Sequence, residues 1–233
     1  MIKSPPFHMN RIGQRGFFLS ALVSFSLASP GVLAAFPDDE ASIEILVPAP
    51  VLPGEDSLPP KASLLAHLRA RAEKGDPSAQ WRLSGELQKG LLINRDLVAS
   101  AYWAELAARQ GHPEAQVSIG YKSEIGLGVT PDEKIARYWY IESIKQGSAE
   151  GIYRMGQLIR DSKSSSAKER ALTSRRALAL FIYSERLGNS AAVDAADRLS
   201  REIGANEAAE ARKLYSELRG LPTSELARIV SFY

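Results

Sequence analysis

The chain contains a segment that repeats at a fixed spacing, and this repeat constrains the fold more than any other feature of the sequence. Residues 75–80, GDPSAQ, recur 36 positions later as GHPEAQ at 111–116, and recur more loosely from Gly147. Trp103 and Trp139 are separated by the same 36 positions. A period of this length is typical of arrays in which one supersecondary unit stacks on the next.

Each unit is predicted to form two helices. In the second unit, Pro113 can start the first helix, because the first helical position needs no amide donor. The glycines of 126–128 can end that helix by adopting positive φ. Thr130 is expected to cap the second helix, with Glu133 completing a capping box, and Asn94 is expected to be the cap in the first unit. These signals place repeats at about 75–110, 111–146, 147–187 and 188–219, the last two less regular, with capping helices at 63–74 and 222–233.

The first 35 residues have the layout of a secretory signal peptide. Three cations and no acidic residue precede an apolar run over 16–27, which is followed by small residues up to Ala35. A run of about 12 apolar residues is too short to span a bilayer as a stable helix. We therefore expect cleavage after Ala34 or Ala35, and a periplasmic or secreted protein without stable membrane insertion. The alternative is an uncleaved anchor, and translation can start at Met1 or Met9.

Residues 36–60 differ in composition from the rest of the chain. They contain six acidic residues, six prolines and no Lys or Arg. Because proline fixes φ and lacks an amide donor, this segment resists helix formation and strand pairing. We expect a disordered, acidic N-terminal linker ahead of a repeat domain at 61–233. The formal net charge of the whole chain is only +2, which does not resemble the basic excess of a nucleic-acid-binding protein.

The residue inventory disfavours most catalytic chemistries. The chain has no cysteine and three histidines, which excludes a disulfide framework, thiolate catalysis and cysteine-ligated zinc. No second ligand lies at metal-binding spacing from His112, and the sequence contains neither a nucleophile elbow nor a phosphate-binding loop. We therefore expect no metal site, no cofactor and no enzymatic activity.

The repeated unit resembles that of the Sel-one-like repeat family, whose members are relatives of the tetratricopeptide repeats. Residues 115–147 match best, although Ser123 and Ile135 replace the tyrosine and lysine of the family pattern. The resemblance implies an all-α solenoid of antiparallel helix pairs that binds proteins or peptides, often in the periplasm. It assigns structural roles to ten positions: Ala79, Trp103, Gly111, Ala115, Gly120, Gly126, Gly128, Trp139, Gly147 and Gly156.

By analogy with related repeats, the first helix of each unit lines a concave, partner-binding face. Trp81, Val117 and Tyr153 occupy equivalent positions 36 residues apart and are predicted to form a column on that face. Aromatic residues at helical spacing are also typical of core packing, so Trp81 and Tyr153 have a second interpretation as core residues. The residues predicted to flank the column are Glu114, Tyr121, Glu124, Gln157 and Arg160.

The third unit replaces the tight glycine turn with a polar, net positive segment, 160–170. We expect a loop there. It is either a tolerated insertion or a binding site for an anionic envelope polymer or an acidic partner.

These features together predict a scaffold for protein–protein interactions in an envelope assembly or regulatory complex. One alternative, from cysteine-rich relatives of the family, is a hydrolase of envelope glycans or β-lactam-like substrates, which the absence of cysteine disfavours. Another is a structural subunit of a motility or polysaccharide-export apparatus.

Overall fold

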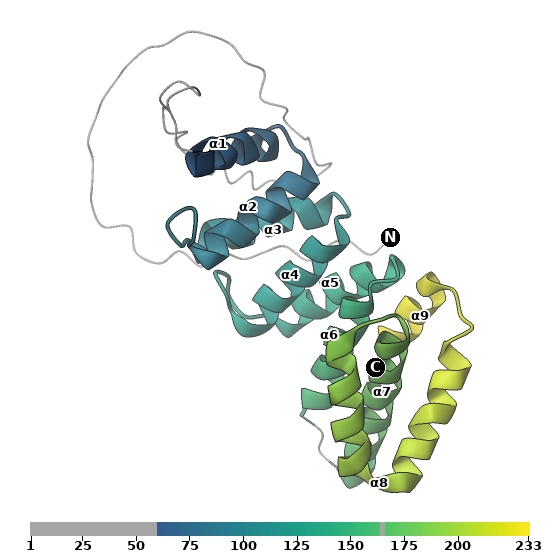
Figure 1. The fold of residues 1–233 in the computed structure, drawn as a ribbon. Coiled ribbons are helices and arrows are strands. Elements are labelled where there is room, and N and C mark those ends of the chain that lie inside the picture. The colour runs from purple at the N-terminus through teal and green to yellow at the C-terminus, as the bar shows by residue number, and fades with distance from the viewer. Residues whose placement is uncertain (1–59, 164–165) are drawn as a thin grey trace, which may run out of the picture.

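The computed structural model describes residues 60–163 and 166–233, and the regular structure in these residues is entirely α-helical. Except for the last one, consecutive helices pack on one another along the chain (Figure 1). The prediction of an all-α solenoid of helix pairs is therefore confirmed. The helices are α1 (Pro60–Glu73), α2 (Pro77–Lys89), α3 (Leu97–Arg109), α4 (Pro113–Ile125), α5 (Glu133–Lys145), α6 (Ala149–Asp161), α7 (Ala167–Arg186), α8 (Ser190–Leu218) and α9 (Thr223–Val230).

The predicted signal peptide, 1–35, and nearly all of the predicted linker lie outside the described residues. The first described residue, Pro60, is the last residue of that linker and begins α1. This helix packs on α2 and buries Ala72 in a small cluster with Leu83 and Leu87.

The pairs α2/α3 and α4/α5 are the regular units of the array. Asp96 and Asp132, 36 residues apart, are the N-caps of α3 and α5. The carboxylate of Asp132 accepts hydrogen bonds from the amides of Lys134 and Ile135, at 2.8 and 3.1 Å. The predictions of Thr130 and Asn94 as caps were therefore wrong. A carboxylate is a strong acceptor that also interacts favourably with the helix dipole, so each helix begins directly after the aspartate.

Glycines allow two of the helix pairs to approach closely. A Cβ atom on Gly120 of α4 would lie 2.7 Å from the ring of Tyr140 in α5. A Cβ atom on Gly156 of α6 would lie 2.7 Å from the ring of Phe181 in α7. Both rings are buried, so the missing side chains provide the space in which the aromatic residues pack.

The predicted loop at 160–170 is mostly helical. Arg160 belongs to α6, which continues to Asp161, and α7 already begins at Ala167. The hydroxyl of Ser166 caps α7 by accepting a hydrogen bond from the amide of Glu169, at 3.2 Å. The prediction of a loop over this whole segment was wrong, because Ser166 supplies a helix start within it.

The C-terminal third departs from the simple stacking of pairs. Gly204 has a φ of 81° and divides α8 into a first arm before it and a second arm after it. The second arm turns back, and α9 packs on α5 (Figure 1). The hydroxyl of Thr223 donates a hydrogen bond to the carbonyl of Lys145, at 2.7 Å, and Leu226 is buried. The last helix was predicted to close over the last repeat, but it packs against the second unit instead because the kink reverses the chain.

Candidate functional site

The predicted column on α2, α4 and α6 is interrupted. Trp81 is 36% exposed, and its ring stacks on that of His112 with the centroids 5.1 Å apart. Val117 is 8% exposed and belongs to the largest core cluster, so it offers little surface to a partner. Tyr153 is half-buried, with its ring 5.6 Å from that of Phe181. Of the three residues, Trp81 is the most available for binding.

The central residue of this face is Arg154, which the sequence did not single out. Its guanidinium lies over the Tyr121 ring of α4, 4.6 Å from the centroid, and 5.8 Å from the centroid of Tyr153. Arg154 Nε donates to Glu150 at 2.8 Å, and Nη1 donates to Gln157 at 3.3 Å. Gln157 in turn donates to the Tyr153 hydroxyl at 2.9 Å. We call these five residues of α4 and α6 the Arg154 cluster.

The other predicted flanking residues have different partners. Glu114 is exposed and lies 3.2 Å from Nδ1 of His112, the N-cap of α4. Glu124 accepts a hydrogen bond from the Tyr140 hydroxyl at 2.6 Å. Burial, together with this carboxylate, raises the pKa of Tyr140 above its ordinary value. Arg160 pairs with its neighbour Asp161 at 2.7 Å. These contacts give Glu124 a role in holding α4 to α5.

The two tryptophans assigned to packing have similar surroundings. Trp139 is buried, and Trp103 is half-buried against the cluster formed by α1 and α2. Each tryptophan makes an edge-to-face contact with the tyrosine before it, Tyr102 or Tyr138, with centroids 5.4 and 5.0 Å apart. The two side chains thus fill equivalent places in successive units.

Four glutamines hold neighbouring helices of the array together, and they were not identified from the sequence. Gln110, at the end of α3, donates to Gln80 of α2 at 2.7 Å, and Gln146, at the end of α5, donates to Gln116 of α4 at 2.7 Å. Gln80 and Gln116 each donate to a carbonyl of the preceding helix, at 3.1 and 3.3 Å. Both bonds recur after 36 residues, and the repeated Ala-Gln pair was the signal that could have revealed them.

A buried lysine also joins the two regular units. Lys122 of α4 is 0% exposed. Its ammonium group donates to the side-chain oxygen of Gln88 in α2 and to the hydroxyl of Ser100 in α3, the latter at 3.0 Å. Burial lowers the pKa of Lys122 from 10.5 to about 8, because desolvation disfavours the charged form.

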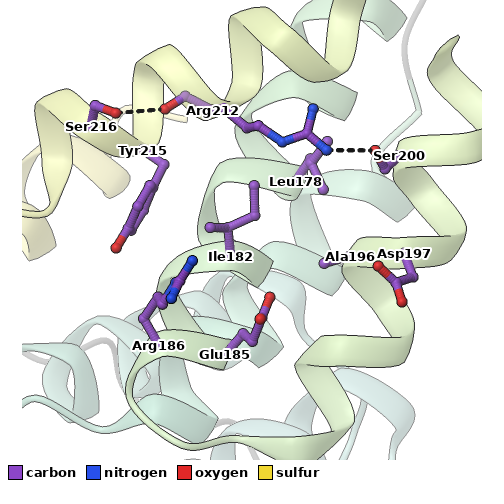
Figure 2. A pocket seen from close by; sticks show the side chains of 10 residues that line it. All are labelled: Leu178, Ile182, Glu185, Arg186, Ala196, Asp197, Ser200, Arg212, Tyr215 and Ser216. Carbon is purple, nitrogen blue, oxygen red and sulfur yellow. Dashed lines mark hydrogen bonds between the residues drawn. The ribbon is translucent and has the colours of Figure 1, made fainter. Parts of the chain in front are cut away.

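A pocket of about 260 Å³ lies between α7 and the two arms of α8 (Figure 2). Leu178 and Ile182 of α7 contribute apolar surface to it. Arg212 reaches from the second arm to the first, where it donates to the hydroxyl of Ser200 at 3.4 Å. The pocket lies in the irregular part of the array, where no repeated pattern pointed to it.

In residues 60–163 and 166–233, no helix combines the length and apolar character that a membrane crossing requires. The same residues contain no group of three or more His, Asp or Glu side chains that could hold a metal ion.

The two regular units match a known family. The model of the Sel1 repeat matches residues 77–112 and 113–148, so each match begins at the first residue of a helix pair, α2/α3 or α4/α5. A comparison with curated proteins gives no match.

Two crystal structures are similar to this chain. One is a Sel1 repeat protein from Oxalobacter formigenes, with 22% identity, a TM-score of 0.42, and 60% of this chain and 49% of that chain covered. The other is c5321, a protective antigen present in uropathogenic Escherichia coli strains displaying an SLR fold, with 24% identity, a TM-score of 0.44, and 72% of this chain and 44% of that chain covered. This chain thus spans about half or less of each protein's length.

Sel1 repeats generally mediate protein–protein interactions, and the two matched units lie in the part of the array that carries Trp81 and Tyr121. Residues 77–148 therefore consist of two Sel1 repeats.

Proposed function

We propose that this chain is an exported scaffold, periplasmic or secreted, that holds a protein partner within an envelope assembly or regulatory complex and has no chemistry of its own. The family supports a role in binding, and the layout of residues 1–35 supports export. The observation that carries the proposal is the Arg154 cluster, in which one guanidinium joins aromatic side chains of two successive helix pairs.

The chemistry of the cluster suits protein recognition. Arginine, tyrosine and tryptophan are enriched among the residues that dominate the binding energy of interfaces. Arg154 is already held by Glu150 and Gln157, so little side-chain freedom is lost when a partner binds. Tyr121 and Tyr153 add aromatic surface with few rotatable bonds, and Trp81 extends the same face by one unit.

This face is suited to an extended peptide segment of the partner. The guanidinium of Arg154 can donate to backbone carbonyls or carboxylates of such a segment. Apolar side chains of the segment can pack on Trp81 and Tyr121, at positions that repeat from one helix pair to the next.

The test is a comparison of partner capture by three forms of the full chain expressed with its own leader. One form is unchanged, one carries Tyr121→Ala with Arg154→Ala, and one carries the control change Arg219→Ala, at an exposed residue after α8. Proteins crosslinked to each form are quantified, and the affinity of the most enriched partner is measured with purified components. We expect the double variant to bind at least about tenfold more weakly, as for the loss of a charge-assisted hydrogen bond, with unchanged far-UV circular dichroism. Equal affinity in all three forms would contradict the proposal.

Export is tested separately by mass spectrometry of the protein recovered from the cells and from the medium. A periplasmic or secreted scaffold is expected to begin at Ala35 or Phe36. A chain that keeps its first residues and stays in the cytosolic fraction would show that the assigned compartment is wrong.

A further inference from the structure

We propose that the pocket between α7 and α8 binds a small zwitterion with an apolar side chain, of the class of a free α-amino acid such as leucine or phenylalanine. The pocket is lined by a different set of residues from the Arg154 cluster, so this binding is independent of the proposed scaffold function.

The charges around the pocket carry the argument. Its lining includes two carboxylates, Glu185 and Asp197, and two guanidinium groups, Arg186 and Arg212. Within the part of the chain that the structure describes, none of the four forms an ion pair. Arg186, Asp197 and Arg212 are exposed, so a ligand that carries one charge of each sign can replace the water that solvates them with direct contacts.

The positions of these groups match the size of an amino acid. Figure 2 shows Arg212 reaching over the pocket to Ser200, with Asp197 on the same helix as Ser200. Asp197 precedes Ser200 by three residues, which is close to one helical turn of about 5.4 Å. A ligand carboxylate bound by Arg212 and Ser200 therefore lies about one turn from Asp197. The ammonium group attached to the neighbouring carbon can face that carboxylate.

The remaining surface suits an apolar side chain. Leu178 and Ile182 of α7 and Ala196 of α8 contribute apolar atoms, and the ring of Tyr215 adds an aromatic wall. Pockets for drug-sized molecules measure about 300–1,000 Å³. A volume of about 260 Å³ is below that range and fits one amino acid better than a longer peptide.

A simple anion or cation fits the pocket less well than a zwitterion. Two groups of each sign give the charged lining a net charge of zero. A lone anion near Arg212 would be repelled by Asp197 and Glu185, and a lone cation would be repelled by the two arginines. A zwitterion has favourable contacts with both sets.

The test is isothermal titration of the full chain with L-leucine and L-phenylalanine. N-acetyl-leucine, which lacks the ammonium group, and leucinamide, which lacks the carboxylate, are titrated as matched ligands. The pocket variants are Arg212→Gln and Asp197→Asn. Their controls, Arg198→Gln and Asp194→Asn, lie on the same helix, are exposed and do not line the pocket.

We expect saturable binding of leucine or phenylalanine by the unchanged chain and by both controls. Each pocket variant, and each blocked ligand, should lose at least about tenfold in affinity, as expected when one charge-assisted contact is removed. Three results would overturn the inference: no saturable binding of either amino acid, equal binding of the blocked ligands, or equal affinities in pocket and control variants. Partner capture through the Arg154 cluster should be the same in Arg212→Gln, which separates the two proposals.

Discussion

Gly120 shows how one missing side chain determines the packing of a helix pair. The ring of Tyr140 occupies the space that a Cβ atom on residue 120 would need. We expect Gly120→Leu to lower the free energy of unfolding by about 1–3 kcal/mol, because the buried ring has to move. Gly85 is the control position, since apart from its chain neighbours and the backbone of α2 no atom lies within 4 Å of its Cβ position. Gly85→Ala should stabilise α2 by about 0.5–1 kcal/mol. Urea denaturation measures both changes, and similar effects in the two variants would contradict this explanation.

Lys122 is expected to make stability depend on pH. Burial lowers its pKa in the folded chain to about 8, below the ordinary 10.5 that it regains on unfolding. Between these values the unfolded chain binds more protons, so stability should rise with pH from about 8 to 10.5. At pH values below that window the amine is charged, and its burial lowers the free energy of unfolding.

Replacement of Lys122 by methionine removes this cost. We expect Lys122→Met to raise the free energy of unfolding at neutral pH by about 1–3 kcal/mol and to flatten its rise in the alkaline range. Lys134→Met is the control, because Lys134 is exposed. Denaturant titrations at several pH values measure the effect, and parallel pH profiles for the unchanged chain and Lys122→Met would exclude it.

The repeat made structural residues easier to predict than functional ones. Gly120, Trp103 and Trp139 could be picked out because they match positions of the repeated pattern, although Ser84 stands at the position of Gly120 in the first unit. Arg154 was not picked out, since the equivalent position is Arg82 in the first unit but Ser118 in the second. Its place opposite Tyr121 depends on how α6 packs against α4, which no single helix encodes.

At the scale of the helix, the caps provide a direct test of the structure against the sequence pattern. Asp132→Ala removes the acceptor for two backbone amides at the start of α5 and should cost about 1 kcal/mol. Thr130→Ala should leave stability almost unchanged, because Thr130 lies outside the helix. Thermal unfolding followed by circular dichroism compares the two variants. A larger loss of stability in Thr130→Ala than in Asp132→Ala would identify Thr130 as the cap instead.

The helices of the regular units were predictable, and those of the last third were not. The starts of α2 and α4 follow from Pro77 and Pro113, which share one position in the repeat. The kink of α8 at Gly204 has no counterpart in the other units. Its effect depends on how α7 packs against α8, including the ion pair of Arg175 with Glu207 of the second arm.

For the molecule as a whole, the return of α9 to α5 links the last helix to the middle of the array. Leu226 is buried at this contact, whereas Phe232 is 76% exposed. We expect Leu226→Ala to destabilise the protein by about 2–5 kcal/mol through the cavity that it leaves, and Phe232→Ala to have little effect. Hydrogen exchange should show faster opening of α5 and α9 in Leu226→Ala. Equal acceleration in α1 and α2 would mean instead that the array opens as one unit.

The contact between α9 and α5 also affects how such an array can change its length in evolution. Tandem repeats gain or lose units by duplication and deletion, since each unit depends mainly on its neighbours. An extra helix pair inserted between α5 and α9 would move the last helix away from its docking place. Duplication is therefore tolerated more easily between α1 and α4, so variation in repeat number among related chains should be concentrated there.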